Sequence, residues 1–350
     1  MIIMNYSKYR NILNRFFLFV GAFNSVLRAR ILNGKPFFIS HLITSRCFAR
    51  CPTCLWRGDS AEEMDTSKII EFYRQARQLG FVSTTFWGGE PLLREDISDI
   101  LKACKRFGFV NGLITNGYLL PQYANQIANT LDFLIVSIDF PSREHDRFRG
   151  VYGLFDNALK GIRLIKASSQ VKIFLNTVVS RANYRSVSDL VKLAEELNIT
   201  ITFESVETGI PQFLRPENDN YENLRLERDK ERQVFATLRS LKVKHRCINN
   251  SYGYLDLFIS DEIKYRCHSP KICIRVNPDG HISNCLNRKQ PIGNVYQDKL
   301  RDLLKSKAMK QLQRQAEKCS FCVDSGVIES SLFWEFNPQV MLNALRYFLR

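Results

Sequence analysis

Apolar residues follow two alternating patterns along the middle of the chain. Short, mostly apolar runs of the kind that form strands are followed by longer segments in which apolar residues recur at every third or fourth position, as on one face of a helix. The strand-like runs cover residues 37–44, 83–87, 112–115, 133–138, 172–178 and 199–203. The helical segments cover residues 67–79, 96–107, 122–130, 155–167 and 187–197.

Six strands that alternate with helices predict a parallel, twisted α/β sheet. Six such units are too few for the closed barrel of eight. We therefore expect an open, partial (βα)6 TIM-like barrel with a small C-terminal cysteine-rich module. In this architecture the chemistry lies in the loops at the carboxyl ends of the strands.

The texture of the sequence changes after residue 217. A charged, helix-prone stretch is followed by a region that holds half of the cysteines, several short strand candidates and the turn Asn277-Pro278-Asp279-Gly280. The expected parts are a basic amphipathic N-terminal segment (1–36), the partial barrel (37–217), a helical connector (218–250), the cysteine-rich module (251–330) and a C-terminal packing helix (331–350).

The composition is that of an ordinary folded protein: of 350 residues, 45% are apolar and 24% are charged, which excludes a disordered chain. No apolar run is long enough to cross a bilayer. The charge is uneven, because the residues before Asp59 include no acid and carry nine of the fifteen net positive charges. The sequence shows no nucleic-acid recognition module, so we expect no nucleic-acid partner.

The early basic residues surround a phenylalanine-rich stretch at residues 16–27. This pattern is typical of a helix that lies in a lipid interface, and equally of a helix that packs on the protein's own surface. Further basic residues follow the apolar stretch where a signal peptide would have a cleavage site. We therefore expect a cytoplasmic protein that an anionic membrane surface could hold on the inner membrane face.

The ten cysteines are grouped rather than spread. In a chain this long and without an export signal, such groups indicate metal ligands more than disulfides. Cys47, Cys51 and Cys54 follow the first strand with the spacing Cx3Cx2C. Three thiolates can hold a four-iron cluster with one iron open to another ligand, whereas a structural zinc site takes four ligands. A zinc-binding regulatory module, completed by a distant ligand, is the non-enzymatic alternative.

The cysteine motif, its place after the first strand, and Gly88-Gly89-Glu90-Pro91 after the second strand resemble the radical S-adenosylmethionine (radical SAM) superfamily. The resemblance covers about residues 37 to 206 and implies a 4Fe-4S cluster that binds SAM and cleaves it reductively to a 5′-deoxyadenosyl radical. It also implies an external one-electron donor of the flavodoxin or ferredoxin type. Glycines at 88 and 89 allow the main chain to approach the methionyl group. Thr53 departs from the family, which usually has an aromatic residue before the third cysteine.

Further residues at strand ends resemble SAM-binding positions of the family. Asn116 follows the third strand, and Ser137 and Asp139, with one residue between them, lie at the end of the fourth. Arg149 resembles an arginine that pairs with the SAM carboxylate, a task for which the planar guanidinium is suited. The resemblance thus implies that the cofactor is bound by Gly88, Gly89, Glu90, Asn116, Ser137, Asp139 and Arg149. Strand-end capping is the alternative role for these side chains.

The C-terminal cysteines carry a second resemblance. Cys267 and Cys285 with Gly280 between them match the opening signature of the SPASM and twitch auxiliary-cluster modules, and Cys319-x2-Cys322 supplies a further pair. Position 328, where a full SPASM module continues with cysteine, is Ile. The resemblance implies one auxiliary 4Fe-4S cluster on Cys267, Cys285, Cys319 and Cys322, with Cys273 as an alternative ligand. A four-thiolate zinc ribbon is the other interpretation.

The sequence says least about the substrate. Because the N-terminal segment is both basic and apolar, we expect a membrane-associated lipid or an isoprenoid-like substrate. A peptide-modifying enzyme of the kind that matures ribosomal peptides is the alternative. Glu204 on the sixth strand is the candidate substrate-facing group, and no residue is identified as catalytic.

Overall fold

The computed structural model describes Leu27, Arg30 and residues 35–56, 62–207, 221–283, 291–320 and 322–349. Almost all of the predicted N-terminal segment lies outside these residues. Of the candidate cysteine ligands, Cys285 also lies outside them. Arg30 donates a hydrogen bond to the carbonyl oxygen of Trp334 at 2.6 Å, and its guanidinium lies over the ring of Phe336. No helix in the described ranges is both long and apolar enough to span a membrane.

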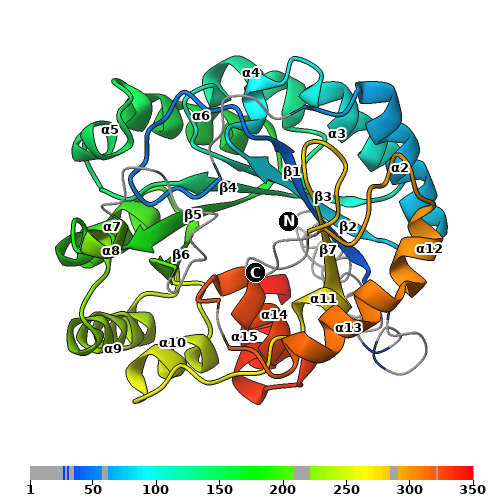
Figure 1. Cartoon of the computed structure of the whole chain (residues 1–350). Helices are drawn as coiled ribbons and strands as arrows, with labels where there is room; N and C mark the ends of the chain where they lie inside the picture. Colours follow the sequence, from blue (N-terminus) through cyan, green and yellow to red (C-terminus); the bar gives the residue numbers. More distant parts are fainter. Residues whose placement is uncertain are drawn as a thin grey trace, which may run out of the picture.

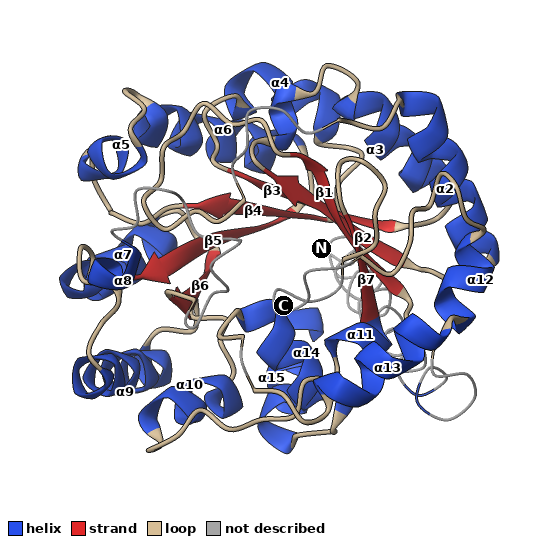
Figure 2. Ribbon diagram, viewed as in Figure 1, coloured by secondary structure: helices blue, strands red, loops and turns tan. Residues whose placement is uncertain are grey.

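A single parallel sheet of seven strands organises the described part of the chain (Figure 2). The strands run in the order β6-β5-β4-β3-β2-β1-β7. Their bounds are β1 Phe38–Thr44, β2 Ser83–Gly88, β3 Val110–Thr115, β4 Phe133–Ser137, β5 Lys172–Val179, β6 Thr200–Ser205 and β7 Cys273–Val276. The six strands expected from the sequence are confirmed, and so is the partial barrel.

Helices cover the outside of the curved sheet, and a second group of helices lies across its open side (Figure 1). The first group returns the chain between consecutive strands, and consists of α2 Thr66–Gln78, α3 Ile97–Arg106, α4 Leu120–Ile127, α5 Glu144–Arg149, α6 Leu154–Ser168 and α7 Val187–Glu196, with the 3-10 turns Pro91–Leu93 and Tyr184–Ser186. The second group follows β6, and consists of α8 Tyr221–Leu224, α9 Arg228–Lys244, α10 Tyr252–Ile259, α11 Ser269–Ile272, α12 Leu300–Lys305, α13 Lys307–Ala316, α14 Ser325–Trp334 and α15 Pro338–Leu349.

The main core lies between the sheet and the outer helices. Strand residues such as Ile39 and Phe86 are fully buried against α2, whose Ile69 and Tyr73 face inward at helical spacing. Burial of side chains of this size stabilises the fold by roughly 1.5–3 kcal/mol each. The sheet therefore gives a rigid support for the loops at its carboxyl edge.

β7 is the strand that the repeating pattern does not contain. It comes from the cysteine-rich region, yet it pairs in parallel with β1, with Phe38 opposite Cys273 and Ser40 opposite Arg275. A four-residue strand carries too little periodicity to reveal its partner. The pairing places the first cysteine loop, which follows β1, and part of the C-terminal cysteine region on neighbouring strands.

Candidate active site

The loop after β1 presents three thiols to one cavity. Cys47, Cys51 and Cys54 are free and line the same space at the carboxyl edge of the sheet. The loop turns tightly, since the amide of Cys54 donates to the carbonyl of Cys51 at 3.1 Å. Burial raises the pKa of the Cys47 thiol to about 11, and the carboxylate of Glu90 and the two neighbouring thiols add to the shift.

The glycine pair after β2 lies against this loop. The amide of Gly89 donates to the carbonyl of Thr44 at 2.8 Å, and that of Glu90 to the carbonyl of Arg46 at 2.8 Å. A Cβ atom on Gly88 would lie 2.1 Å from the Thr44 oxygen, and one on Gly89 would lie 2.1 Å from the Arg46 oxygen. Gly88 also has a φ of 146°. The glycines therefore serve the packing of one loop on another, a role the sequence analysis did not assign them.

Glu90 joins the second strand to the third. Its buried carboxylate accepts hydrogen bonds from the amide of Leu92 at 3.0 Å, the hydroxyl of Thr115 at 2.8 Å and the amide of Asn116 at 2.8 Å. Burial raises its pKa to about 7, although these three donors stabilise the charged form. These bonds fix the end of β3 beside the glycine pair.

The residues at the ends of β3, β4 and β5 face the same cavity. The side-chain amide of Asn116 lies 3.9 Å from the sulfur of Cys47, and its oxygen accepts the amide of Tyr118. Ser137 and Asn176 are register partners on β4 and β5, and both line the cavity. The structure thus brings Asn116 and Ser137, which the sequence analysis named, to the cavity that the three thiols line, and places Asn176 beside them.

Asp139 and Arg149 form a buried ion pair beside the cysteine loop. The Nε and Nη2 atoms of Arg149 lie 2.8 and 2.7 Å from Oδ2 of Asp139, and Oδ1 accepts the amide of Val178. Burial alone would lower the pKa of Arg149, but the charge and hydrogen bond of Asp139, together with the nearby thiols of Cys51 and Cys54, outweigh burial and the pKa is raised. The carbonyl of Arg149 accepts the amide of Arg50, which ties α5 to the cysteine loop.

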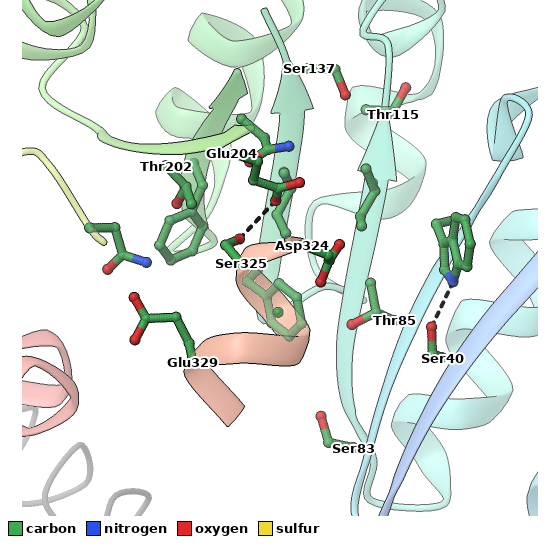
Figure 3. Close-up of a pocket in the computed structure, with 18 of the residues that line it drawn as sticks. Ser40, Ser83, Thr85, Thr115, Ser137, Thr202, Glu204, Asp324, Ser325 and Glu329 are labelled. Atoms are coloured by element: carbon green, nitrogen blue, oxygen red, sulfur yellow. Dashed lines mark hydrogen bonds between the residues drawn. The ribbon is translucent and has the colours of Figure 1, made fainter. Parts of the chain in front are cut away.

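A cavity of about 1760 Å³ runs along the inner face of the sheet (Figure 3). Apolar and aromatic side chains such as Phe174 share its wall with hydroxyl and carboxyl groups. The polar side chains labelled in the close-up are Ser40, Ser83, Thr85, Thr115, Ser137, Thr202, Glu204, Asp324, Ser325 and Glu329. Barrel interiors are usually filled by branched apolar residues, so short hydroxyl side chains leave room here for a ligand.

Carboxyl groups from β6 and α14 meet on one side of this cavity. Glu204 accepts a hydrogen bond from the hydroxyl of Ser325 at 2.7 Å. Burial, followed by the charge of Asp324, raises the pKa of Glu204. Burial likewise raises the pKa of Glu207 and of Glu329 to about 7. The sequence analysis singled out Glu204 alone, because no motif marks the acids that α14 brings opposite it.

Two tryptophans and an arginine form the wall between the first cysteine loop and β7. The guanidinium carbon of Arg275 lies 5.0 Å from the ring centre of Trp56 and 5.4 Å from that of Trp87. The indole nitrogen of Trp87 donates to Ser40 at 2.8 Å. All four residues line the cavity. Sequence reasoning missed this wall, because it depends on the pairing of β1 with β7.

Three of the C-terminal cysteines gather around Tyr265. The amide of Cys267 donates to the carbonyl of Cys319 at 3.1 Å, and the hydroxyl of Tyr265 donates to the carbonyl of Cys322 at 2.8 Å. Burial raises the pKa of the Cys322 thiol, and nearby charges, first that of Glu207, raise it further. Cys273 lies at the start of β7, where its sulfur is 3.5 Å from the hydroxyl of Ser269.

The donor sets fit iron–sulfur clusters. Three thiols on one loop, with main chain packed closely behind them and an arginine beside Cys51, match the ligand number of a cluster that keeps one iron open. Thiols from two distant segments meet again around Tyr265. Within the ranges that the structure describes, no three His, Cys, Asp or Glu side chains are already close enough to hold a single metal ion.

Two family models match the chain, and together they cover more than half of it. The Radical SAM superfamily model matches residues 42–206, and the SPASM iron–sulfur cluster-binding domain model matches residues 267–323. Among solved structures, SuiB of Streptococcus suis bound to S-adenosylmethionine has a TM-score of 0.65 and 16% identity, over 87% of this chain and 76% of SuiB. The structure of anSMEcpe with bound AdoMet has a TM-score of 0.65 and 15% identity, over 89% of this chain and 99% of anSMEcpe.

These similarities agree with the site in both halves of the molecule. The first model covers the barrel and the three-thiol loop, and the second covers the segment that holds Cys267, Cys319 and Cys322. A 4Fe-4S cluster, SAM and an auxiliary iron–sulfur centre are the cofactors of such an enzyme. The chain therefore belongs to the radical SAM superfamily, as an enzyme with a C-terminal SPASM iron–sulfur domain.

Proposed function

We propose that the enzyme modifies a peptide, with the reaction taking place in the cavity between the three-thiol loop and α14. Cys47, Cys51 and Cys54 hold the first cluster, which when reduced with SAM bound supplies a 5′-deoxyadenosyl radical. Cys267, Cys285, Cys319 and Cys322 hold the auxiliary centre, with Cys273 as the alternative ligand. The proposal replaces the expected lipid or isoprenoid-like substrate.

The observation that carries the peptide assignment is the chemistry of the cavity wall. Glu204, Asp324, Ser325 and Glu329 come from two elements and line one side of it. Glu204 and Glu329 each accept a hydrogen bond within the chain, but a hydrocarbon chain packed against them would remove water from the rest of each carboxyl group, at a cost of up to several kcal/mol. A peptide supplies amide and side-chain donors for the same oxygens. SuiB bound to its precursor peptide SuiA gives further support, with a TM-score of 0.64 over 90% of this chain.

The chain's own residues have distinct tasks in this proposal. Arg149 uses Nε and Nη2 on Asp139, and its remaining N–H groups would meet the SAM carboxylate. Asn116 and Ser137 would bind other polar atoms of SAM from the ends of their strands. Glu90, whose oxygens accept three donors from the chain, holds the loops after β2 and β3 together, and would in this way position the SAM-binding residues that they carry.

The test compares two classes of substrate on the anaerobically reconstituted enzyme. One arm contains a pooled library of short synthetic peptides, and the other contains anionic vesicles doped with a polyprenyl phosphate. Dithionite-dependent 5′-deoxyadenosine and new product masses are measured in both. We expect the peptides to stimulate 5′-deoxyadenosine formation and to yield modified peptides, and the vesicles to do neither. Stimulation by the vesicles alone would restore the lipid assignment, and stoichiometric zinc without SAM cleavage would contradict both.

A further inference from the structure

The segment that carries Cys322 is docked on the end of β6 by a carboxylate. The two oxygens of Glu207 accept hydrogen bonds from the main-chain amides of Val323 and Asp324, each at 3.3 Å. Asp324 in turn caps α14 by accepting the amide of Val327 at 2.8 Å. The main chain directly after Cys322 is therefore fixed between the barrel and the start of a helix.

A second carboxylate, from β6 itself, holds the next residue of the same segment. Glu204 accepts the hydroxyl of Ser325 at 2.7 Å, but among the residues that the structure describes it bonds no main-chain amide next to Cys322. On the other side, the carbonyl of Cys322 accepts the hydroxyl of Tyr265 at 2.8 Å. Glu204 and Glu207 thus share a strand end and a cavity, while only Glu207 contacts the residue that follows the thiol.

Glu207 also acts on the thiol through its charge. Its oxygens lie 3.3 Å from the amide nitrogens of Val323 and Asp324, the two residues that follow the thiol, and Glu207 and Cys322 line the same cavity. Arg275 lines the same cavity and is the cation on the side of β7. Charge and geometry therefore both connect this carboxylate to a candidate ligand of the auxiliary centre, and neither depends on which peptide the enzyme modifies.

We propose that Glu207 is a positioning residue of the auxiliary iron–sulfur centre: it fixes the main chain that presents Cys322, and its negative charge holds the reduction potential of that centre low. Reduction adds one electron to the cluster, and a carboxylate nearby opposes the added negative charge. Partners outside the ligand set of a metal centre are known to tune it in this way.

The test uses the full chain with Cys47, Cys51 and Cys54 changed to Ala, so that the auxiliary centre is the one observed. In this background Glu207→Gln is compared with Glu204→Gln, which makes the same substitution at a second buried carboxyl group near the end of β6. Each protein is reconstituted with iron and sulfide, and the cluster is titrated with dithionite at mildly alkaline pH and followed by electron paramagnetic resonance. We expect the midpoint potential to become more positive in Glu207→Gln and to stay unchanged in Glu204→Gln.

Iron content tests the positioning half of the proposal. Glu207→Ala leaves two amides without their acceptor, and we expect it to lose more than half of the auxiliary iron while Glu204→Ala keeps it. If Glu207→Gln loses the auxiliary iron while Glu204→Gln keeps it, the loss supports the proposal that Glu207 fixes the main chain at Cys322. Glu207→Asp, which keeps the charge, is then titrated in place of Glu207→Gln. An unchanged potential in Glu207→Gln, an equal shift in Glu204→Gln, or full iron in Glu207→Ala would each overturn the proposal. None of these readouts depends on a substrate.

Discussion

The loop with Cys47, Cys51 and Cys54 and the segment with Cys322 are held in place by different kinds of contact. Main-chain hydrogen bonds from Gly89 and Glu90 fix the first, whereas the carboxylate of Glu207 fixes the second. The close approach of the two main chains at positions 88 and 89 needs glycine, which a motif shows. A contact from one distant carboxylate leaves no such trace in the sequence.

Cys51 and Cys322 also differ in the sign of the charged group that acts most strongly on each thiol. Burial raises the pKa of Cys51, while Arg149 works against that rise; burial raises the pKa of Cys322, and Glu207 adds to it. The arginine beside Cys51 would suit a bound anion, as the proposed contact of Arg149 with the SAM carboxylate requires. The site with Cys322 holds the same kind of ligands in a negative setting. Four substitutions test this contrast.

Removal of one thiol from the first loop should have the largest effect. Cys51→Ala leaves two ligands where three are needed, so we expect 5′-deoxyadenosine formation to fall to background and the first cluster's iron to be lost, with the auxiliary iron retained. Iron analysis and product chromatography measure both. Cys104→Ala, at a buried position on α3, is the control and should keep both 5′-deoxyadenosine formation and the iron of the first cluster. Normal SAM cleavage by Cys51→Ala would remove this loop from the active site.

Arg149→Ala should destabilise the fold strongly, because it leaves the buried Asp139 without its cation. We expect a loss of about 3–5 kcal/mol in the free energy of unfolding, measured in urea without oxygen. Adding Asp139→Asn should recover much of this, since Asn can still accept the amide of Val178 at the oxygen that takes the place of Oδ1. A double variant whose loss is the sum of the two single losses would show that the pair is not coupled.

Gly89→Ala tests whether the first loop depends on main-chain contact. The added Cβ would lie 2.1 Å from the Arg46 oxygen, so we expect a loss of about 1–3 kcal/mol and a lower iron content at the first site. Gly80→Ala is the matched control: its φ of 97° strains the new side chain, but no atom lies within 4 Å. It should cost about 1 kcal/mol and leave the iron unchanged. Equal iron in the two variants would refute the steric role of Gly89.

The smallest effect concerns pH and the acids of α14. Burial raises the pKa of Glu329 from 4.5 to about 7, so the folded state binds this proton more tightly than the unfolded state. The stabilisation is present below the unfolded pKa and is lost as the pH rises through about 7. Glu329→Gln does not undergo this loss. Its free energy of unfolding relative to the parent should therefore rise by about 1–2 kcal/mol between roughly pH 5 and pH 8. The effect is this small because the side chain partly faces the cavity. A stability difference between Glu329→Gln and the parent that does not change with pH would contradict the raised pKa of Glu329.

Sequence reasoning succeeded where the physical cause is local. The period of two or of three to four residues gave all six barrel strands, and the thiols and glycines of the first loop lie within a few residues of one another. It could not place β7, because four residues carry no readable period, and with β7 it missed the wall of Trp56, Trp87 and Arg275. Glu207 and Asp324 escaped notice for a related reason, since their proximity arises from the docking of α14 on β6.

The pairing of β1 with β7 has a consequence for how the chain acquires its shape during synthesis. Strands β1 to β6 pair with neighbours that leave the ribosome one after another. The other edge of β1, however, stays unpaired at Phe38 until Cys273 of β7 has been made. Contacts so far apart in sequence form late, and an uncovered strand edge invites pairing with another chain. We expect chains stalled between α10 and β7 to have a formed six-stranded sheet with β1 open to protease, and chains stalled well after β7 to be protected there. The time for which that edge stays open would then be set by the speed of translation through the connector.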